Sequence, residues 1–144
     1  MSDRVEAGAE LTNQKVQFTA TARDNPPIVF DYYPPFGDGK GYTGLEGLLA
    51  SLCACSGTSV LGLLRKNGTD VVGLKVQAIG QRRTKHPTCF ETIALHFDVV
   101  SANASDEGVR EAIRLSEELV CPVWAMIKGN VEIGVTHAIT APDA

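Results

Sequence analysis

Positive charge is scarce in this sequence, and its scarcity argues against two classes of partner. The 144 residues include 13 lysines and arginines against 17 acidic residues, which gives a net charge of −4 and a pI near 5.3. No overall field therefore favours nucleic acid or an anionic membrane. The one basic cluster, at 82–86, is short, and such runs are typical of solvated loops. We expect no nucleic-acid partner and no membrane partner.

Cysteines are also few, and the first ten residues lack an apolar segment. Four cysteines in a chain of this length are too few for the disulfide scaffold of a small secreted domain. The stretch MSDRVEAGAE does not have the pattern of a secretory signal. We therefore expect a cytoplasmic protein with reduced thiols, in which any disulfide is transient and catalytic.

Several catalytic motifs are missing as well. No glycine-rich phosphate loop follows a predicted strand, and no Ser-His-Asp arrangement can be read from the sequence. A metal site of Cys53, Cys55, Cys121 and a histidine is disfavoured, because a C-x-C pair within a helix splays its ligands apart. We interpret His137, on the apolar side of the last predicted strand, as a hydrogen-bonded core histidine. We expect no cofactor and no metal.

One apolar stretch stands out, from Leu45 to Lys66. Between Glu46 and Arg65 it carries no charge over 18 residues, and its leucines cover most of the circumference of a helix. A helix that is apolar all round is a buried one. Its length only just reaches that of a membrane span, and glycines and serines dilute it, so we interpret it as the central helix of a soluble protein. Thr43 and Glu46 predict a capping box at its start.

The remaining periodicities predict strands around this helix. Alternation and turn residues indicate strands at 15–22, 28–33, 74–81, 90–100 and 131–139. A second helix is predicted from a cap at Ser105 to Val120, with an inner stripe of Val109, Ala112, Ile113, Ser116, Leu119 and Val120. Residues 1–12 are polar, and we expect them to be mobile or weakly paired. The predicted order is β-β-α-β-β-α-β with a buried central helix, an α+β fold in a single domain of residues 1–144.

Cys55 on the first helix and Cys121 after the second are our candidates for thiol chemistry. A cysteine reacts as the thiolate, so its pKa of ~8.5 must be lowered for reactivity at neutral pH. Pro122 suits a first helical position, which places Cys121 at an N-cap where backbone N–H groups favour an anion. Cys55 has no such help, because apolar surroundings raise a thiol pKa, so it needs a cation brought from elsewhere.

Arg23, at the end of the first predicted strand, is our candidate for that cation. Glu46 lies nine residues before Cys55, about 13 Å along the helix, where it would orient the arginine without touching the thiol. Packing is the alternative role for any single cysteine, because free cysteines are among the most buried residues. We interpret Cys89 and Cys53 as packing residues. Cys53 lies about 200° around the helix from Cys55, so the two are not expected to share a site.

The segment GYTGLEGLLASLCACSGTSVLGLLRKNGTDVVGL resembles the signature helix of the OsmC/Ohr family, the osmotically inducible and organic-hydroperoxide-resistance proteins. A second landmark of that family, a helix that closes in Cys-Pro-Val or Cys-Pro-Ile, is similar to SEELVCPV at 116–123. Gly44 and Gly47 depart from the proline and leucine usual in the family. In its best-studied branch the glutamate that holds the arginine lies ten residues before the cysteine, where this chain has Leu45.

The resemblance implies a fold, an assembly and an activity. Members form intertwined homodimers, and the activity implied is that of a thiol-dependent peroxidase acting on organic hydroperoxides. Cys55 would be the peroxidatic cysteine and Cys121 the resolving one, with a sulfenic acid on Cys55 followed by a Cys55–Cys121 disulfide. A dithiol or a lipoylated protein would then reduce the disulfide by exchange.

Two other functions are also compatible with the sequence. A non-catalytic OsmC-like protein would use the apolar dimer cleft to hold a hydrophobic small molecule, with its cysteines merely buried. A thiol redox sensor would form the same disulfide, which would alter binding to a partner without catalytic turnover.

Overall fold

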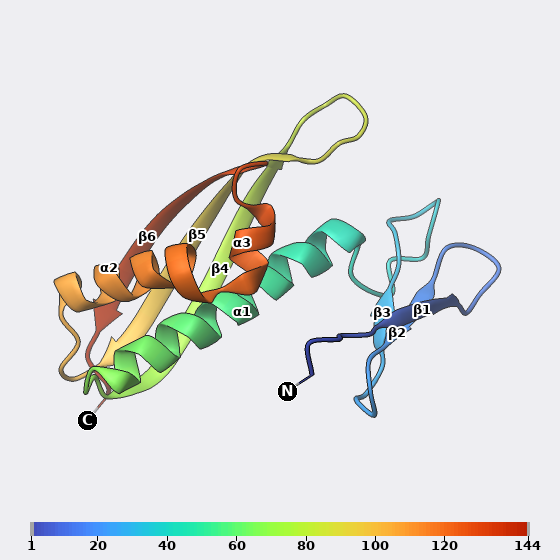
Figure 1. Ribbon diagram of the computed structural model, residues 1–144. Coiled ribbons are helices and arrows are strands. Elements are labelled where there is room, and N and C mark those ends of the chain that lie inside the picture. The colour runs from blue at the N-terminus through green and yellow to red at the C-terminus, as the bar shows by residue number, and fades with distance from the viewer. Residues whose placement is uncertain (1, 144) are drawn as a thin grey trace. The chain divides into compact units, whose positions relative to one another are not determined.

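The computed structural model describes residues 2–143, which form two compact units, one up to Leu48 and one from Leu49 on (Figure 1). The first unit contains an antiparallel sheet in the order β1-β2-β3, with strands β1 (Gly8–Leu11), β2 (Phe18–Thr21) and β3 (Ile28–Phe30). Helix α1 (Gly44–Lys66) begins in this unit and continues into the second.

The second unit contains a three-stranded sheet with helices packed against it. Strands β4 (Val71–Arg82) and β5 (Phe90–Ser101) form an antiparallel hairpin, and β6 (Glu132–Thr140) pairs parallel with β5. Parallel neighbours need a crossover connection. Helix α2 (Asp106–Leu115), the π-helical turn η1 (Ser116–Val120) and helix α3 (Pro122–Ile127) supply it, and Figure 1 shows them across one face of the sheet.

The structure confirms the predicted α+β class and adds one strand to the predicted order. Gly8–Leu11 pairs with β2 over four residues, where the sequence led us to expect a mobile or weakly paired segment. All four residues of β1 are exposed, so no apolar alternation marks the strand in the sequence. Its backbone hydrogen bonds to β2 define it instead.

The core of the second unit lies between β5 and the helices. Alternate residues of β5 are buried, as its pattern predicts: Ile93, Leu95, Phe97 and Val99. Helix α1 adds residues at four-residue spacing, which share one face of a helix: Leu52, Ser56, Val60 and Leu64. Along its other sides α1 is half-buried or exposed, so the helix is buried along one stripe and not all round.

Helix α1 is also the one helix of residues 2–143 that is long and apolar enough to cross a membrane, a test that core helices of soluble proteins pass too. Its start confirms the predicted capping box. The Thr43 backbone N–H donates to Glu46 Oε1 at 2.8 Å, and the Glu46 N–H donates to Thr43 Oγ1 at 3.2 Å. The next residue, Gly47, contacts β3, because a Cβ there would lie 2.6 Å from Cε1 of Phe30.

Asp31 organises the loop that joins β3 to α1. Its buried carboxylate accepts backbone N–H groups from Tyr32 at 2.8 Å, Lys40 at 3.0 Å and Asp38 at 3.2 Å. The Lys40 N–H is the main reason that the pKa of Asp31 lies below its usual value. Gly37 closes the same loop, since a Cβ on it would lie 2.3 Å from the Tyr32 carbonyl oxygen.

Candidate active site

Cys121 is the N-cap of α3, as the sequence predicts. Its backbone is extended, with φ −75° and ψ 109°, and Pro122 occupies the first turn of the helix. Proline restricts the residue before it to such conformations, which separates Cys121 from the preceding helix. The Trp124 backbone N–H donates to Cys121 Sγ at 3.4 Å, so the cap is made by the thiol itself.

Burial outweighs the cap in setting the acidity of this thiol. Cys121 is 2% exposed, and its burial raises the pKa of the thiol above the usual value. The backbone N–H groups of Trp124 and Val123 act in the opposite direction, and the neighbouring Cys55 thiol raises the pKa further. The cap therefore acts in the direction that the sequence predicts, but burial outweighs it, and this thiol is protonated at neutral pH.

The structure makes the thiols of Cys55 and Cys121 neighbours, close enough for Cys55 to affect the pKa of Cys121, although the two residues are 66 positions apart in the chain. Cys55 is half-buried on α1, and Cys121 lies beneath the surface beside it. Cys53 is also half-buried, and its burial raises its pKa. Cys89 is exposed in the loop that precedes β5, so the packing role expected for it is not seen in this chain.

The π-helical turn η1 changes which side chains of this region face inward. The buried stripe of α2 runs through Val109, Ala112, Ile113 and Ser116. Leu119 and Val120 should continue it in an α-helix, but they are 76% and 49% exposed. The prediction that they belong to the inner stripe is therefore wrong, and Cys121 is the next buried residue.

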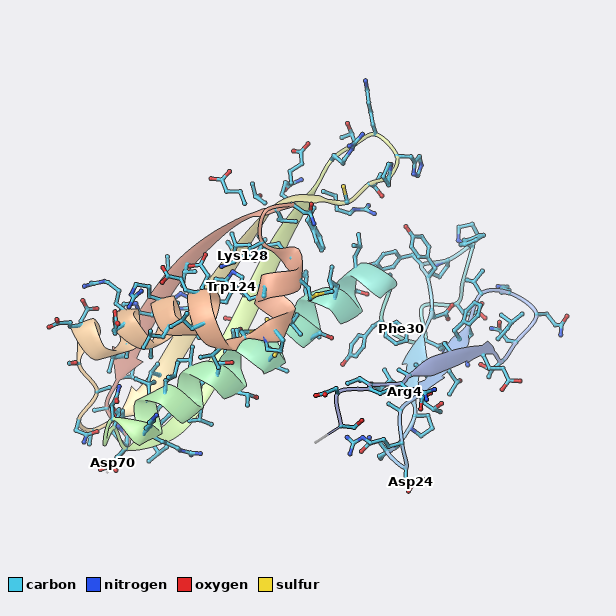
Figure 2. The ribbon with its side chains drawn as sticks, viewed as in Figure 1. Arg4, Asp24, Phe30, Asp70, Trp124 and Lys128 are labelled. Atoms are coloured by element: carbon cyan, nitrogen blue, oxygen red, sulfur yellow. The ribbon has the colours of Figure 1, made fainter. Side chains whose placement is uncertain are left out.

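Two buried polar groups near Cys121 have no hydrogen-bond partner among the described residues. They are the Ser116 hydroxyl and the Trp124 indole N–H, both fully buried. Figure 2 shows Trp124 on α3. Neither group was identified from the sequence, where Ser116 reads as one more residue of an amphipathic stripe. Pro122 was the only signal of a local break.

The other two candidate residues, Glu46 and Arg23, lie in the first unit. The Glu46 carboxylate caps α1 and accepts the Tyr33 hydroxyl at 3.4 Å, and no arginine of residues 2–48 pairs with it. The Thr43 backbone N–H is the main cause of its lowered pKa. Arg23 lies exposed in the turn after β2, with a φ of 54° that non-glycine residues rarely adopt.

His137 has a hydrogen-bond partner, as expected of a core histidine. Its side chain is 14% exposed, and Nε2 lies 2.6 Å from Asp106 Oδ1 in the first turn of α2. This contact is the main cause of the lowered pKa of Asp106. The pair ties α2 to β6. Within residues 2–143, no group of three or more His, Cys, Asp or Glu side chains is arranged to hold a metal ion.

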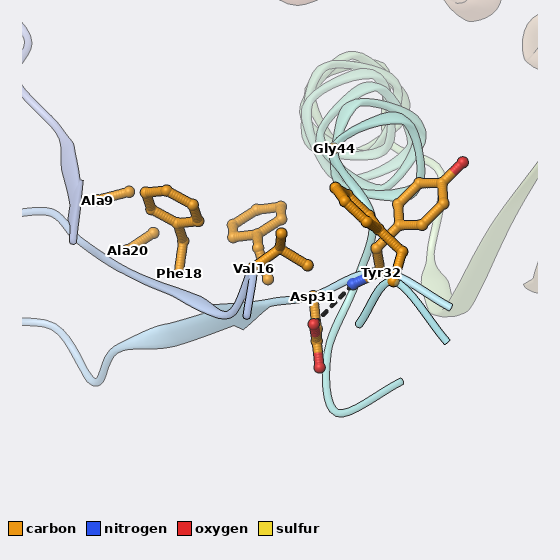
Figure 3. Close-up of a pocket in the computed structure, with 9 residues that line it drawn as sticks. Ala9, Val16, Phe18, Ala20, Asp31, Tyr32 and Gly44 are labelled. Carbon is orange, nitrogen blue, oxygen red and sulfur yellow. Dashed lines mark hydrogen bonds between the residues drawn. The ribbon is translucent and has the colours of Figure 1, made fainter. Parts of the chain in front are cut away.

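The first unit has an apolar hollow of about 380 Å³ (Figure 3). Its lining comes from all three strands, the loop after β3 and the start of α1. Aromatic rings make up much of it, those of Phe18, Phe30, Tyr32 and Phe36. Asp31 contributes the charged side chain, whose carboxylate accepts the Tyr32 backbone N–H. The hollow therefore offers apolar surface and little polar recognition.

Comparison with known proteins identifies the family. A family model described as OsmC-like protein matches residues 37–136. The chain belongs to the OsmC-like family. Protein YhfA of Escherichia coli (strain K12) is 32% identical to this OsmC-like chain over 102 residues, 71% of this chain and 76% of that protein.

Solved structures agree with this assignment. A hypothetical protein from Aquifex aeolicus VF5 has a TM-score of 0.86 and 27% identity, with 99% of this chain and 100% of that chain covered. The organic hydroperoxide resistance protein OhrB of Bacillus subtilis shares the fold, with a TM-score of 0.63 and 16% identity over 94% and 98% of the two chains. Cys55, Cys121 and Glu46 lie inside the matched region of this OsmC-like chain, and Arg23 lies outside it.

Proposed function

We propose that this OsmC-like chain is a cytoplasmic thiol peroxidase that reduces organic hydroperoxides through Cys55 and Cys121. The observation that carries the proposal is the meeting of these two thiols, brought from α1 and the start of α3. Membership of the OsmC-like family supports peroxide chemistry, since a protein of the same fold is named for organic hydroperoxide resistance.

The different environments of the two thiols favour an order of events. Cys55 is half-buried and open to a substrate, whereas Cys121 is buried and protonated. The Cys55 thiolate attacks the terminal oxygen of the hydroperoxide, and the O–O bond breaks. The alkoxide takes a proton from water and leaves as the alcohol, and Cys55 is oxidised to a sulfenic acid. Cys121 sulfur then attacks Cys55 sulfur. The hydroxyl leaves as water with the Cys121 proton, and a disulfide forms. An external dithiol or lipoylated protein returns both thiols by exchange.

Arg23 and Glu46 are proposed to activate Cys55, with Glu46 orienting the arginine. A cation near a thiol favours the thiolate and lowers its pKa. The positive φ of Arg23 supports a special role, because such backbone conformations cluster at functional sites. We further propose the intertwined homodimer implied by the family, which would cover apolar side chains that the single chain leaves exposed, such as Phe36 and Tyr42.

The mechanism can be tested with one equivalent of tert-butyl hydroperoxide, followed by mass spectrometry. We expect a Cys55–Cys121 disulfide in the wild type and a trappable Cys55 sulfenic acid in Cys121→Ser. Arg23→Ala should slow Cys55 oxidation by about tenfold or more, because a nearby cation shifts a pKa by about one unit or more. Arg4→Ala is the matched control, since Arg4 is an exposed arginine of the same unit.

Unchanged peroxide consumption by Cys55→Ser, with dithiothreitol as reductant, would disprove the peroxidase. If Arg23→Ala and Arg4→Ala slowed Cys55 oxidation equally, Arg23 would have no specific role in the mechanism. The proposed roles of Cys55 and Cys121 would still stand.

The apolar hollow favours binding of a hydrophobic small molecule as a second candidate function. Its volume of about 380 Å³ lies within the range of small-molecule sites. Two results together would favour this function over catalysis. A fluorescent apolar probe would bind saturably to the wild type and not to Phe18→Asp, and the hydroperoxide would oxidise neither thiol.

A further inference from the structure

The inward orientation of Cys121 is not what a continuous α-helix would give. In an α-helix, successive residues turn by about 100°, so residue 121 would lie about 140° around the axis from Ser116. Residue 120 would be the one that continues the buried stripe. The structure shows the reverse, with Cys121 2% exposed and Val120 49% exposed.

The backbone of η1 accounts for this shift by one residue. The Cys121 N–H donates to the Ser116 carbonyl oxygen at 2.8 Å, a bond that spans five residues where an α-helix spans four. One additional residue is thereby accommodated between the last buried position of α2 and Cys121. Such π-helical turns are rare and are often found at functional sites.

We propose that η1 is a positioning element, which sets Cys121 and not Val120 against Cys55. This inference rests on the proposed function, because it concerns the resolving thiol of that reaction. Its cost is visible in the structure, since Leu119 and Val120 are turned toward solvent.

Pro122 fixes where the turn ends. It has no N–H to continue α2, and its ring would clash with the carbonyl of Glu118 in an unbroken α-helix. The same proline is pre-organised for the start of α3, where the Trp124 N–H contacts Cys121 Sγ. Cys121 is therefore fixed at two points. Its backbone N–H donates to the Ser116 carbonyl oxygen, and its thiol accepts the Trp124 N–H at the cap of α3.

The experiment moves the thiol by one residue. In the double variant Val120→Cys/Cys121→Val, the relocated thiol should lie on the exposed side of η1 and fail to reach Cys55. Diamide oxidises neighbouring thiols without peroxide, so its use makes the readout independent of peroxidase activity. We expect the disulfide with Cys55 to form at least about 100-fold more slowly than in the wild type. Circular dichroism and the thermal midpoint verify that the variant is folded.

The single variant Val120→Cys provides an internal competition in a nearly isosteric background. Peptide mapping after diamide should show Cys55 paired with Cys121 at least about tenfold more often than with the thiol added at position 120. Pairing of Cys55 with the thiol at position 120 in either variant, at a rate close to that of the wild-type disulfide, would show that the segment adopts the α-helical register and would overturn the proposal. A wild type that forms the disulfide with diamide but is not oxidised by hydroperoxide would contradict the proposed function alone.

Discussion

At the residue scale, two opposing effects on the Cys121 thiol decide its protonation state. The N-cap position of Cys121 favours the thiolate, yet burial raises its pKa, and burial is the larger effect. Cap geometry follows from Pro122 and can be read from the sequence. Burial depends on the sheet and on α1, so its magnitude is decided only in the folded chain. A protonated Cys121 suits a thiol that acts second.

Asp31 gives the first prediction at this scale. Its carboxylate accepts three backbone N–H groups, of which that of Lys40 contributes most to the lowered pKa. A lowered pKa contributes stability above the unfolded value of 3.8, and this stability is lost as the pH falls through the folded value. Asp31→Asn should therefore lower the urea midpoint near pH 7, and its difference from the wild type should shrink toward about pH 3.

Asp24→Asn provides the control for this titration, because Asp24 is exposed in the turn after β2. We expect its urea midpoint to follow that of the wild type across the pH range. A pH-independent difference for Asp31→Asn would mean that the loop depends on the shape of the side chain and not on its charge.

At the element scale, helix α1 contains glycines with different structural roles. Gly47 allows the Phe30 ring to contact the helix, since a Cβ there would lie 2.6 Å and 3.0 Å from two of its carbons. A Cβ on Gly62 would meet nothing within 4 Å. The sequence marked Gly47 only as a departure from the family pattern, and the contact with β3 explains it.

The two glycines make a matched pair of alanine substitutions. Gly62→Ala should raise the free energy of unfolding by about 0.5–1 kcal/mol, because alanine has the higher helix propensity. Gly47→Ala should lose this gain or become destabilising, because the Phe30 ring must be displaced. Urea denaturation of both variants measures the difference, and an equal gain in the two would show that the Phe30 contact imposes no constraint.

Turn η1 is the element at which hydrophobic periodicity fails to predict which side chains are buried. The apolar residues of 109–120 fit an α-helical stripe to its end, so the sequence predicts Leu119 and Val120 inside. The π-helical turn of residues 116–120 leaves both side chains exposed. Local spacing cannot indicate such a change, because the neighbours of Cys121, which are Cys55 on α1 and Trp124 on α3, are set by the tertiary fold.

At the scale of the whole molecule, many large apolar side chains are exposed in the single chain. The exposed residues of the first unit include Leu11, Phe18, Ile28, Tyr33, Phe36 and Tyr42. Where such side chains are contiguous on the surface, they are typical of an interface. We predict a homodimer in solution, whose thermal midpoint rises with protein concentration, because association stabilises the folded state by mass action.

Sedimentation and thermal unfolding over a hundredfold dilution series measure this dependence. Phe18→Glu should weaken the dimer, because Phe18 belongs to this exposed apolar set. Glu107→Gln should not, since Glu107 is an exposed polar residue of α2 outside that set. A monomer at every concentration, with a constant midpoint, would contradict the predicted assembly.

The sequence by itself determined the α+β class, the central helix with its capping box, and the candidate thiols on their two elements. These follow from local rules, since strand alternation, cap chemistry and the effect of proline act over a few residues. The meeting of Cys55 and Cys121 follows from no local rule, although the family resemblance implied it. Only the tertiary structure showed that burial raises the pKa of Cys121 and that Gly8–Leu11 pairs as a strand. Contacts between residues far apart in the chain produce these three features, and neither spacing nor composition specifies such contacts.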